Sequence, residues 1–170
     1  MRHLILFLVF LIASGAHAAP SATVEVVQSP AWLDQGGRRV AVAPGAAMDS
    51  EARLVTGAQA RLVIRLAEGS TVKLGENTRF SFRHAPESSL YKAALNVLVG
   101  AFRFTTTALG QGYRRDIRAT VGTATIGIRG TDVWGKAADD RDFVVLIEGS
   151  IDIEREGQNV TMSTPQTIFN

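Results

Sequence analysis

The feature that most constrains this chain is a two-residue alternation of apolar and polar side chains. It recurs in short stretches separated by glycine-containing turns, among them Arg61–Leu66, Phe102–Phe104 and Ile151–Ile153. A period of two places every second side chain on one face of an extended strand. Helical periodicity is nearly absent from the rest of the chain. The sequence therefore predicts an all-β fold built from short strands.

One segment departs from this pattern. Four apolar residues in Ser88–Leu98 follow a helical spacing, and Ser88 stands where it can cap a helix. The end of the segment, Val97–Gly100, fits a strand as well. We expect this part of the chain to form a short helix or an insertion.

A turn-and-strand unit also recurs along the chain. It consists of a glycine, a small residue and an apolar-x-apolar strand, and it occurs at Gly69–Leu74, Gly100–Phe104 and Gly149–Ile153. Glycine admits a positive φ, and the small residue lets the next strand pack closely. Such recurrence favours hairpins or stacked coils. The irregular spacing does not separate a solenoid from a sandwich; the predicted fold is a single all-β domain, solenoid-like or a β-roll.

The first eighteen residues have the three-part plan of a secretory signal peptide. Arg2 is followed by the apolar run Leu4–Ile12 and by small residues that end at Ala18. Cleavage is expected after Ala18, and the alternative is a short N-terminal anchor helix. The apolar run is too short to cross a bilayer core about 30 Å thick. We expect a periplasmic or secreted domain with no membrane span.

The inventory of reactive side chains excludes several kinds of site. The chain has no cysteine, and its three histidines are His3, His17 and His84. With the first two in the signal peptide, catalysis by a Cys/His pair and zinc sites built from Cys and His are excluded. No cofactor or metal is predicted. A Ser-His-Asp triad would have to use His84, which we expect to be a solvated histidine in a turn after a strand.

The segment with the most information runs from Ile117 to Trp134. Its second half contains Arg129, Gly130, Thr131 and Asp132, followed shortly by Trp134. Gly130 permits a sharp turn, and the Thr131 hydroxyl can bond back to the turn backbone. These five residues are candidates either for a structural turn or for partner binding. As a tryptophan beside a turn, Trp134 is either an exposed contact or an edge of the core.

Arg129 stands on the polar side of its strand, opposite the apolar Ile126 and Ile128. There its guanidinium can pair with a carboxylate on a neighbouring strand. The candidate carboxylates are Asp132, Glu148 and Asp152.

This segment resembles the signature of the FecR domain family. Ala124–Ile128 precedes the Arg-Gly-Thr-Asp sequence and Val144–Ile151 follows it, while Leu66–Leu74 and Leu98–Phe104 match the earlier strands of the family in order. The resemblance implies a periplasmic, solenoid-like β domain. Together with the signal-peptide pattern, it divides the chain into a signal peptide (1–18), an N-terminal β segment (19–54), a FecR-like domain (55–153) and a C-terminal strand and tail (154–170).

In the name-giving members of the family, this domain follows a cytoplasmic anti-sigma segment and a membrane helix, and it relays a signal from an outer-membrane transporter. Since no such helix or segment is expected here, the chain resembles the stand-alone secreted members. The expected function is an exported, non-catalytic binding or assembly module that contacts an envelope protein or polysaccharide. One alternative is a sensing partner of a separate membrane anti-sigma or transport system. The other is a glycan hydrolase that uses carboxylates among Asp132, Asp139, Asp140, Asp142 and Glu148.

Charge is segregated along the chain. Residues 61–136 carry twelve basic and five acidic side chains, whereas residues 137–170 carry two basic and seven acidic ones. The net charge of +2 is small for a protein that grips a nucleic acid backbone, so no nucleic acid partner is expected. Either the acidic C-terminal strands pair with the basic middle strands, or a basic patch faces an acidic partner such as a polysaccharide or lipid head group. Pairing is favoured because adjacent strands of a solenoid bring such rows together.

Overall fold

The computed structural model describes residues 19–86, 90–108, 114–165 and 168–169, and all regular structure in these residues is β-strand. The prediction of an all-β fold is confirmed. The strands are β1 (Ala22–Gln28), β2 (Ala31–Gln35), β3 (Arg38–Ala41), β4 (Ala47–Met48), β5 (Arg53–Thr56), β6 (Arg61–Leu66), β7 (Thr71–Leu74), β8 (Arg79–Pro86), β9 (Leu90–Thr105), β10 (Arg114–Val121), β11 (Ala124–Ala137), β12 (Asp142–Arg155), β13 (Gln158–Met162) and β14 (Ile168–Phe169). In the described part of the chain, no helix is long and apolar enough to cross a bilayer.

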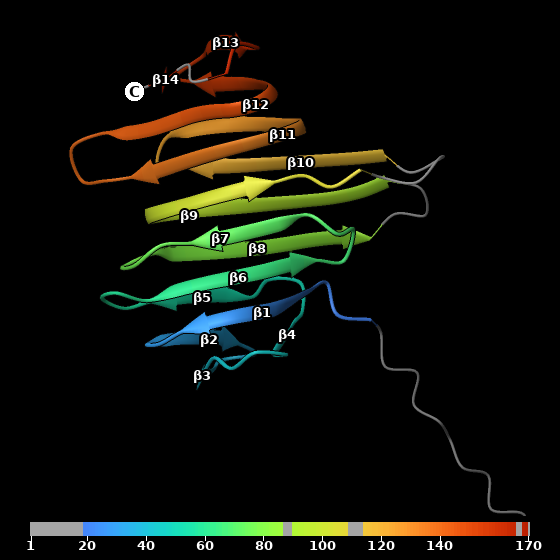
Figure 1. Cartoon of the computed structure of the whole chain (residues 1–170), viewed down its shortest axis with the longest axis vertical. Coiled ribbons are helices and arrows are strands. Elements are labelled where there is room, and N and C mark those ends of the chain that lie inside the picture. The colour runs from blue at the N-terminus through green and yellow to red at the C-terminus, as the bar shows by residue number, and fades with distance from the viewer. Residues whose placement is uncertain (1–18, 87–89, 109–113, 166–167, 170) are drawn as a thin grey trace, which may run out of the picture.

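The strands form one open, hydrogen-bonded sheet that folds back on itself (Figure 1). The fold is made by the long strands β9, β11 and β12, each of which changes neighbours partway along. In β9, Leu90–Val97 pairs with β8 and β10, whereas Gly100–Thr105 pairs with β7 and β11. Each long strand therefore belongs to two layers.

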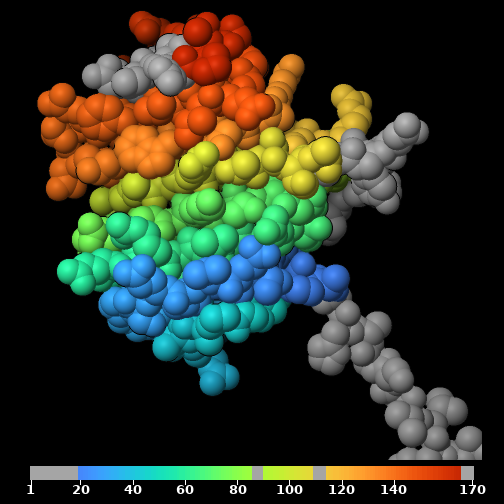
Figure 2. Space-filling view, viewed as in Figure 1, coloured from blue at the N-terminus to red at the C-terminus, as the bar shows by residue number. Residues whose placement is uncertain are grey.

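We call these the front layer and the back layer. The front layer comprises β4, β1, β6, β7, Gly100–Thr105 of β9, Asp132–Ala137 of β11, Asp142–Glu148 of β12 and β14. The back layer comprises β3, β2, β5, β8, Leu90–Val97 of β9, β10, Ala124–Arg129 of β11, Ser150–Arg155 of β12 and β13. The strands follow one another along the long axis nearly in sequence order, as the colours of Figure 2 show.

The hydrophobic core lies between the two layers. Leu62 and Ile64 of β6 in front and Leu54, Phe80 and Phe82 behind are all at most 2% exposed, and they belong to one continuous cluster. The intervening residues of these strands are more exposed, as the alternation predicts. The outer faces of both layers are therefore largely polar.

The expectation of a short helix or an insertion in Ser88–Leu98 is wrong for the residues the structure describes. From Leu90 onward the chain is strand β9, in which Ala93, Leu95 and Val97 are buried at alternate positions. Residues 88 and 89 lie outside the described residues. β9 is hydrogen-bonded on both sides, to β8 and in parallel to β10. Pairing with distant segments overrides the local helical spacing.

Candidate functional site

Arg129, Gly130 and Thr131 lie inside one continuous strand, β11, and not at a turn between two strands. This corrects the expectation of a turn. The pairing of β11 with β12 shifts in register between Arg129 and Asp132, and Gly130 there has a φ of +62°. Two residues of β11, Gly130 and Thr131, stand there opposite one residue of β12, Gly149. Such a β-bulge bends a strand without ending it. The bend carries β11 from the back layer to the front layer.

Thr131 and Gly149 hold this crossing together. The Thr131 side chain is buried, and its hydroxyl accepts a hydrogen bond from the Arg129 N–H at 3.2 Å and donates one to the Ser150 carbonyl at 3.4 Å. Gly149 makes the corresponding bend in β12 with a φ of +88°. A Cβ at this position would lie 2.3 Å from the Gly130 carbonyl oxygen, so only glycine fits the close approach of the two backbones.

The remaining motif residues face opposite sides of the molecule. The Arg129 side chain is 83% exposed on the back layer, 3.9 Å from Asp152. Asp132 lies on the front layer and accepts hydrogen bonds from Arg103 at 2.8 and 2.6 Å, which raises the pKa of the Arg103 guanidinium. Arg129 and Asp132 therefore do not form one site.

Trp134 lines a groove on the front layer with a volume of about 600 Å³. We call it the front groove. Lys73, Arg103 and Trp134 are neighbours in register across β7, β9 and β11, and Lys136 lines the groove as well. The half-buried indole thus lies beside cationic side chains, which outnumber the two carboxylates of the groove, Glu76 and Asp139. An aromatic face beside cations suits a sugar ring or an acidic partner surface.

A second hollowed surface, which sequence reasoning missed, lies on the back layer. Three hollows of about 890, 370 and 920 Å³ follow one another along it, and we call them together the back groove. Arginines from several strands line it, including Arg53, Arg83, Arg118 and Arg129. The segregated charge was the available signal, but it did not indicate on which face the arginines gather.

The acidic strand β12 lies beside the middle strand β11, as favoured from the sequence, but most ion pairs among the described residues do not join the two. Arg65 pairs with Glu25 of the N-terminal segment, while Arg103 pairs with Asp132 within the middle segment. The 3.9 Å contact of Arg129 joins the middle strands to the acidic C-terminal part. The register of the strands, and not charge, sets which rows meet, and several arginines stay exposed.

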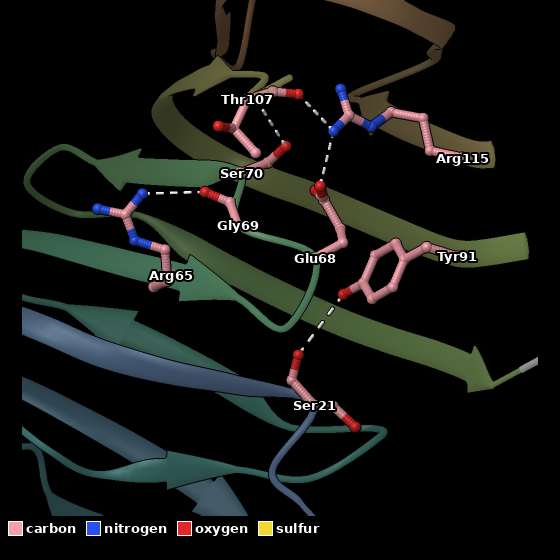
Figure 3. A network of polar contacts seen from close by, with 8 residues as sticks. All are labelled: Ser21, Arg65, Glu68, Gly69, Ser70, Tyr91, Thr107 and Arg115. Atoms are coloured by element: carbon pink, nitrogen blue, oxygen red, sulfur yellow. Dashed lines mark hydrogen bonds and ion pairs between the residues drawn. The ribbon is translucent and has the colours of Figure 1, made fainter. Parts of the chain in front are cut away.

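The most buried ion pair among the described residues joins Glu68 to Arg115 (Figure 3). Arg115, at the start of β10, donates from Nη2 to Glu68 of the β6–β7 turn and to the Thr107 carbonyl, both at 2.7 Å. The two side chains are only 10% and 4% exposed, and Arg115 Nε and Glu68 Oε1 have no hydrogen-bond partner among the residues that the structure describes. Tyr91 lies beside them, and its pKa is raised by burial and by the charge of Glu68. This Glu68–Arg115 cluster joins the two layers.

The expectation that His84 lies in a solvated turn is wrong. β8 continues through Pro86, and His84 pairs with Ala93 inside the sheet. Its half-buried ring stacks on Tyr91 with a centroid distance of 4.5 Å, and its Nδ1 lies 3.2 Å from the Ser21 hydroxyl. Burial lowers the pKa of His84. No ion pair or hydrogen bond joins the ring to a carboxylate within the described ranges, so a Ser-His-Asp triad is not assembled there.

The carboxylates considered for hydrolysis are dispersed. Asp139 and Asp140 are exposed, and Arg141 lowers the pKa of Asp140 through a hydrogen bond. Asp142 is buried and accepts hydrogen bonds from the Thr123 N–H and hydroxyl. Asp132 and Glu148 stand opposite each other in register, but both Asp132 oxygens are bound by Arg103. Among the described residues, no group of three or more histidine and carboxylate side chains is placed to hold a metal ion.

Comparison with known proteins gives one family and one fold. A family model described as FecR protein matches residues 52–152. Two crystal structures of a "putative anti-sigma factor" from Parabacteroides distasonis ATCC 8503, at 1.65 and 2.50 Å resolution, each match with a TM-score of 0.52 and 17% identity. Each match covers 69% of this chain and 54% of the other, so the chain spans about half the length of these proteins. No curated protein sequence matches.

Proposed function

Because this chain belongs to the FecR family, we propose that it is a non-catalytic module that binds a protein or polysaccharide of the cell envelope. The observation that carries the proposal is the family match over residues 52–152, which includes both crossings of the long strands β11 and β12. Family and fold together support a regulatory role more than a catalytic one. The dispersed carboxylates give the hydrolase alternative no assembled acid–base pair.

Export is the second part of the proposal. Residues 1–18 lie outside the described residues, and their composition supports a signal peptide cleaved after Ala18. The module would then act in the periplasm or outside the cell. Within it we keep three segments: 19–54, the FecR-like part 55–153, and 154–170. Their near-sequential stacking, with long strands that pass from layer to layer, supports a solenoid-like description.

The front groove is the proposed contact surface. Trp134 supplies an aromatic face, and Lys73 and Lys136 have no ion-pair partner within the described ranges. Interfaces draw much of their energy from a few aromatic and arginine side chains. Gly130, Thr131 and the backbone N–H of Arg129 have the structural role of the crossing, and Asp132 orients Arg103 toward the groove.

Two measurements test the proposal. Intact mass of the protein recovered from an envelope fraction should show a chain that begins at Ala19. The immobilised chain should retain a protein or a polysaccharide from envelope extract, and the Trp134→Ala variant should retain less. Recovery of the chain with Met1 in the cytosol contradicts export. Retention of nothing, or equal retention by both forms, contradicts the binding role of the front groove.

A sensing partner of a separate membrane anti-sigma system is the second candidate, and the family membership favours it. If it is correct, deletion of the gene should change transcription of a sigma-dependent set of genes, and Trp134→Ala should reproduce that change. Unchanged transcription in both strains would contradict a signalling role and leave a structural binding module.

A further inference from the structure

We propose that the back groove binds an extended anionic polysaccharide. This inference rests on the proposed binding role and deepens it, because it adds a ligand class and a second surface on the layer opposite Trp134. It concerns the arginine surface of the back layer, which no sequence motif indicates.

The back groove is continuous across the strands of the back layer. The first hollow shares Arg83 and Ala94 with the second, and the second shares Asp116 and Arg118 with the third. Nine arginine and lysine side chains line the three hollows against five carboxylates. Positive charge stays in excess even without Arg115, which Glu68 neutralises. A long surface of one sign attracts a polyanion.

Three of these arginines are held only loosely. Arg83, Arg118 and Arg129 lie 3.7, 3.7 and 3.9 Å from their nearest carboxylates, and their side chains are 73%, 69% and 83% exposed. By contrast, Arg103 on the front layer makes two hydrogen bonds to Asp132 at 2.8 and 2.6 Å. Contacts near 4 Å in water are worth only about 1 kcal/mol. The guanidiniums of these three arginines therefore remain available to the anions of a ligand, unlike that of Arg39, which makes two hydrogen bonds to Asp34 at 2.6 Å.

The spacing of the cations suits a polymer laid across the strands. Arg83 of β8, Ala94 of β9 and Arg118 of β10 stand in one register row, followed by Gly127 of β11. Two strand spacings separate Arg83 from Arg118, about 10 Å. The small residues Ala94 and Gly127 leave room beside each guanidinium. A chain with regularly repeated anionic groups can follow this row.

A polar ladder runs beside the arginine row. Ser81, Asn96, Thr120 and Thr125 are consecutive register partners across β8, β9, β10 and β11. All four are half-buried, and none of their side chains makes a hydrogen bond within the described part of the chain. Hydroxyl and amide groups at strand spacing offer donors and acceptors to sugar hydroxyls. This ladder distinguishes a glycan site from a surface that is only positively charged.

The same groove is poorly suited to a folded protein partner. Its large apolar lining residues include Phe82, Leu95, Ile117, Ile128 and Ile153, all at most 2% exposed. Protein interfaces rely on exposed aromatic and aliphatic anchors at their centre. The lining offers charge and hydrogen-bonding groups instead, so an acidic protein becomes an outcome of the test.

The test measures binding of the purified chain to immobilised polygalacturonate, a linear polyuronate, with neutral dextran and polyglutamate as comparison probes. We expect polygalacturonate to bind, dextran not to bind, and binding to fall steeply with added salt. The Arg83→Gln/Arg118→Gln variant should bind about tenfold more weakly, equivalent to about 1.4 kcal/mol. The matched control is Arg65→Gln/Arg141→Gln, which also removes two exposed arginines paired with carboxylates but lies outside the groove. Its affinity for polygalacturonate should stay within about twofold of that of the original chain.

Thr120→Val separates the two kinds of ligand, because it removes a ladder hydroxyl without changing charge. It should weaken polygalacturonate binding and leave polyglutamate binding unchanged. Absence of polygalacturonate binding at low salt overturns the proposal, as do equal losses in the two double variants. If polyglutamate binds as tightly as polygalacturonate, and Thr120→Val changes neither affinity, the groove is assigned to an acidic polypeptide instead. None of these results bears on export or on Trp134, so failure here is distinguishable from failure of the proposed function.

Discussion

The Glu68–Arg115 pair gives the sharpest prediction about stability. In Glu68→Gln the side chain keeps its shape and loses its charge, which leaves a guanidinium that is only 10% exposed without its counter-charge. Removal of one partner from a buried ion pair costs about 3–5 kcal/mol. For a domain of this size, each kcal/mol lowers Tm by about 2–4 °C, so the expected fall in Tm is about 6–20 °C.

The control is Glu25→Gln, since Glu25 and Arg65 form a hydrogen-bonded pair that is 36% and 47% exposed. An exposed pair of this kind contributes about 0–1 kcal/mol to stability. The Tm of Glu25→Gln should therefore fall by less than about 4 °C. A second variant, Glu68→Leu/Arg115→Met, removes both buried charges together. It should be more stable than Glu68→Gln, because no uncompensated charge remains in the interior.

Thermal and urea unfolding at pH 7, followed by circular dichroism, measures all three variants. Equal losses in Glu68→Gln and Glu25→Gln would refute the reasoning, because burial would then make no difference. A double variant less stable than Glu68→Gln would show that the cluster contributes through its hydrogen bonds and not through charge compensation.

Three further predictions concern the crossing, the histidine and the front groove. Gly149→Ala should destabilise the fold by more than about 2 kcal/mol in urea titrations, whereas Gly130→Ala, with open space at its Cβ, should cost only the left-handed backbone strain of about 1–2 kcal/mol. Burial lowers the pKa of His84, so the folded state resists protonation of the ring and stability should fall as pH drops below about 6.5. His84→Gln should reduce that fall when Tm is compared at pH 7.5 and 5.5; an unchanged fall would assign it to other groups. Trp134→Ala should weaken the affinity for the retained envelope component about 30-fold, or about 2 kcal/mol, with unchanged Tm; a Tm loss with unchanged affinity would make Trp134 a core edge.

The alternation in sequence was enough to predict the strands and the buried rows. Leu62, Ile64, Phe102 and Phe104 are buried as their period requires. Successive side chains of an extended strand point to opposite faces whichever strands become its neighbours, so the buried row follows from the sequence alone. The strand in Ser88–Leu98 could not be predicted locally, because its pairing partners, β8 and β10, come from other parts of the chain.

The surfaces were harder to predict than the core. Arg129 and Asp132 are three residues apart, yet the bulge at Gly130 sends them to opposite layers. A count of charges along the chain contains no information about such a crossing. The count favoured ion pairs between the middle and the C-terminal strands. The back groove depends on register across five strands, Arg53 on β5 through Arg129 on β11, which no local pattern contains.

The central claim is that this FecR-family chain is an exported module that contacts an envelope component through its front groove. The most direct measurement places a photoreactive residue at position 134, and in a parallel strain at the exposed position 141, and irradiates living cells. Position 134 should give a discrete adduct between an envelope component and a chain that begins at Ala19, and position 141 should not. The same adducts from both positions, or an uncleaved chain found only in the cytosol, would contradict the claim.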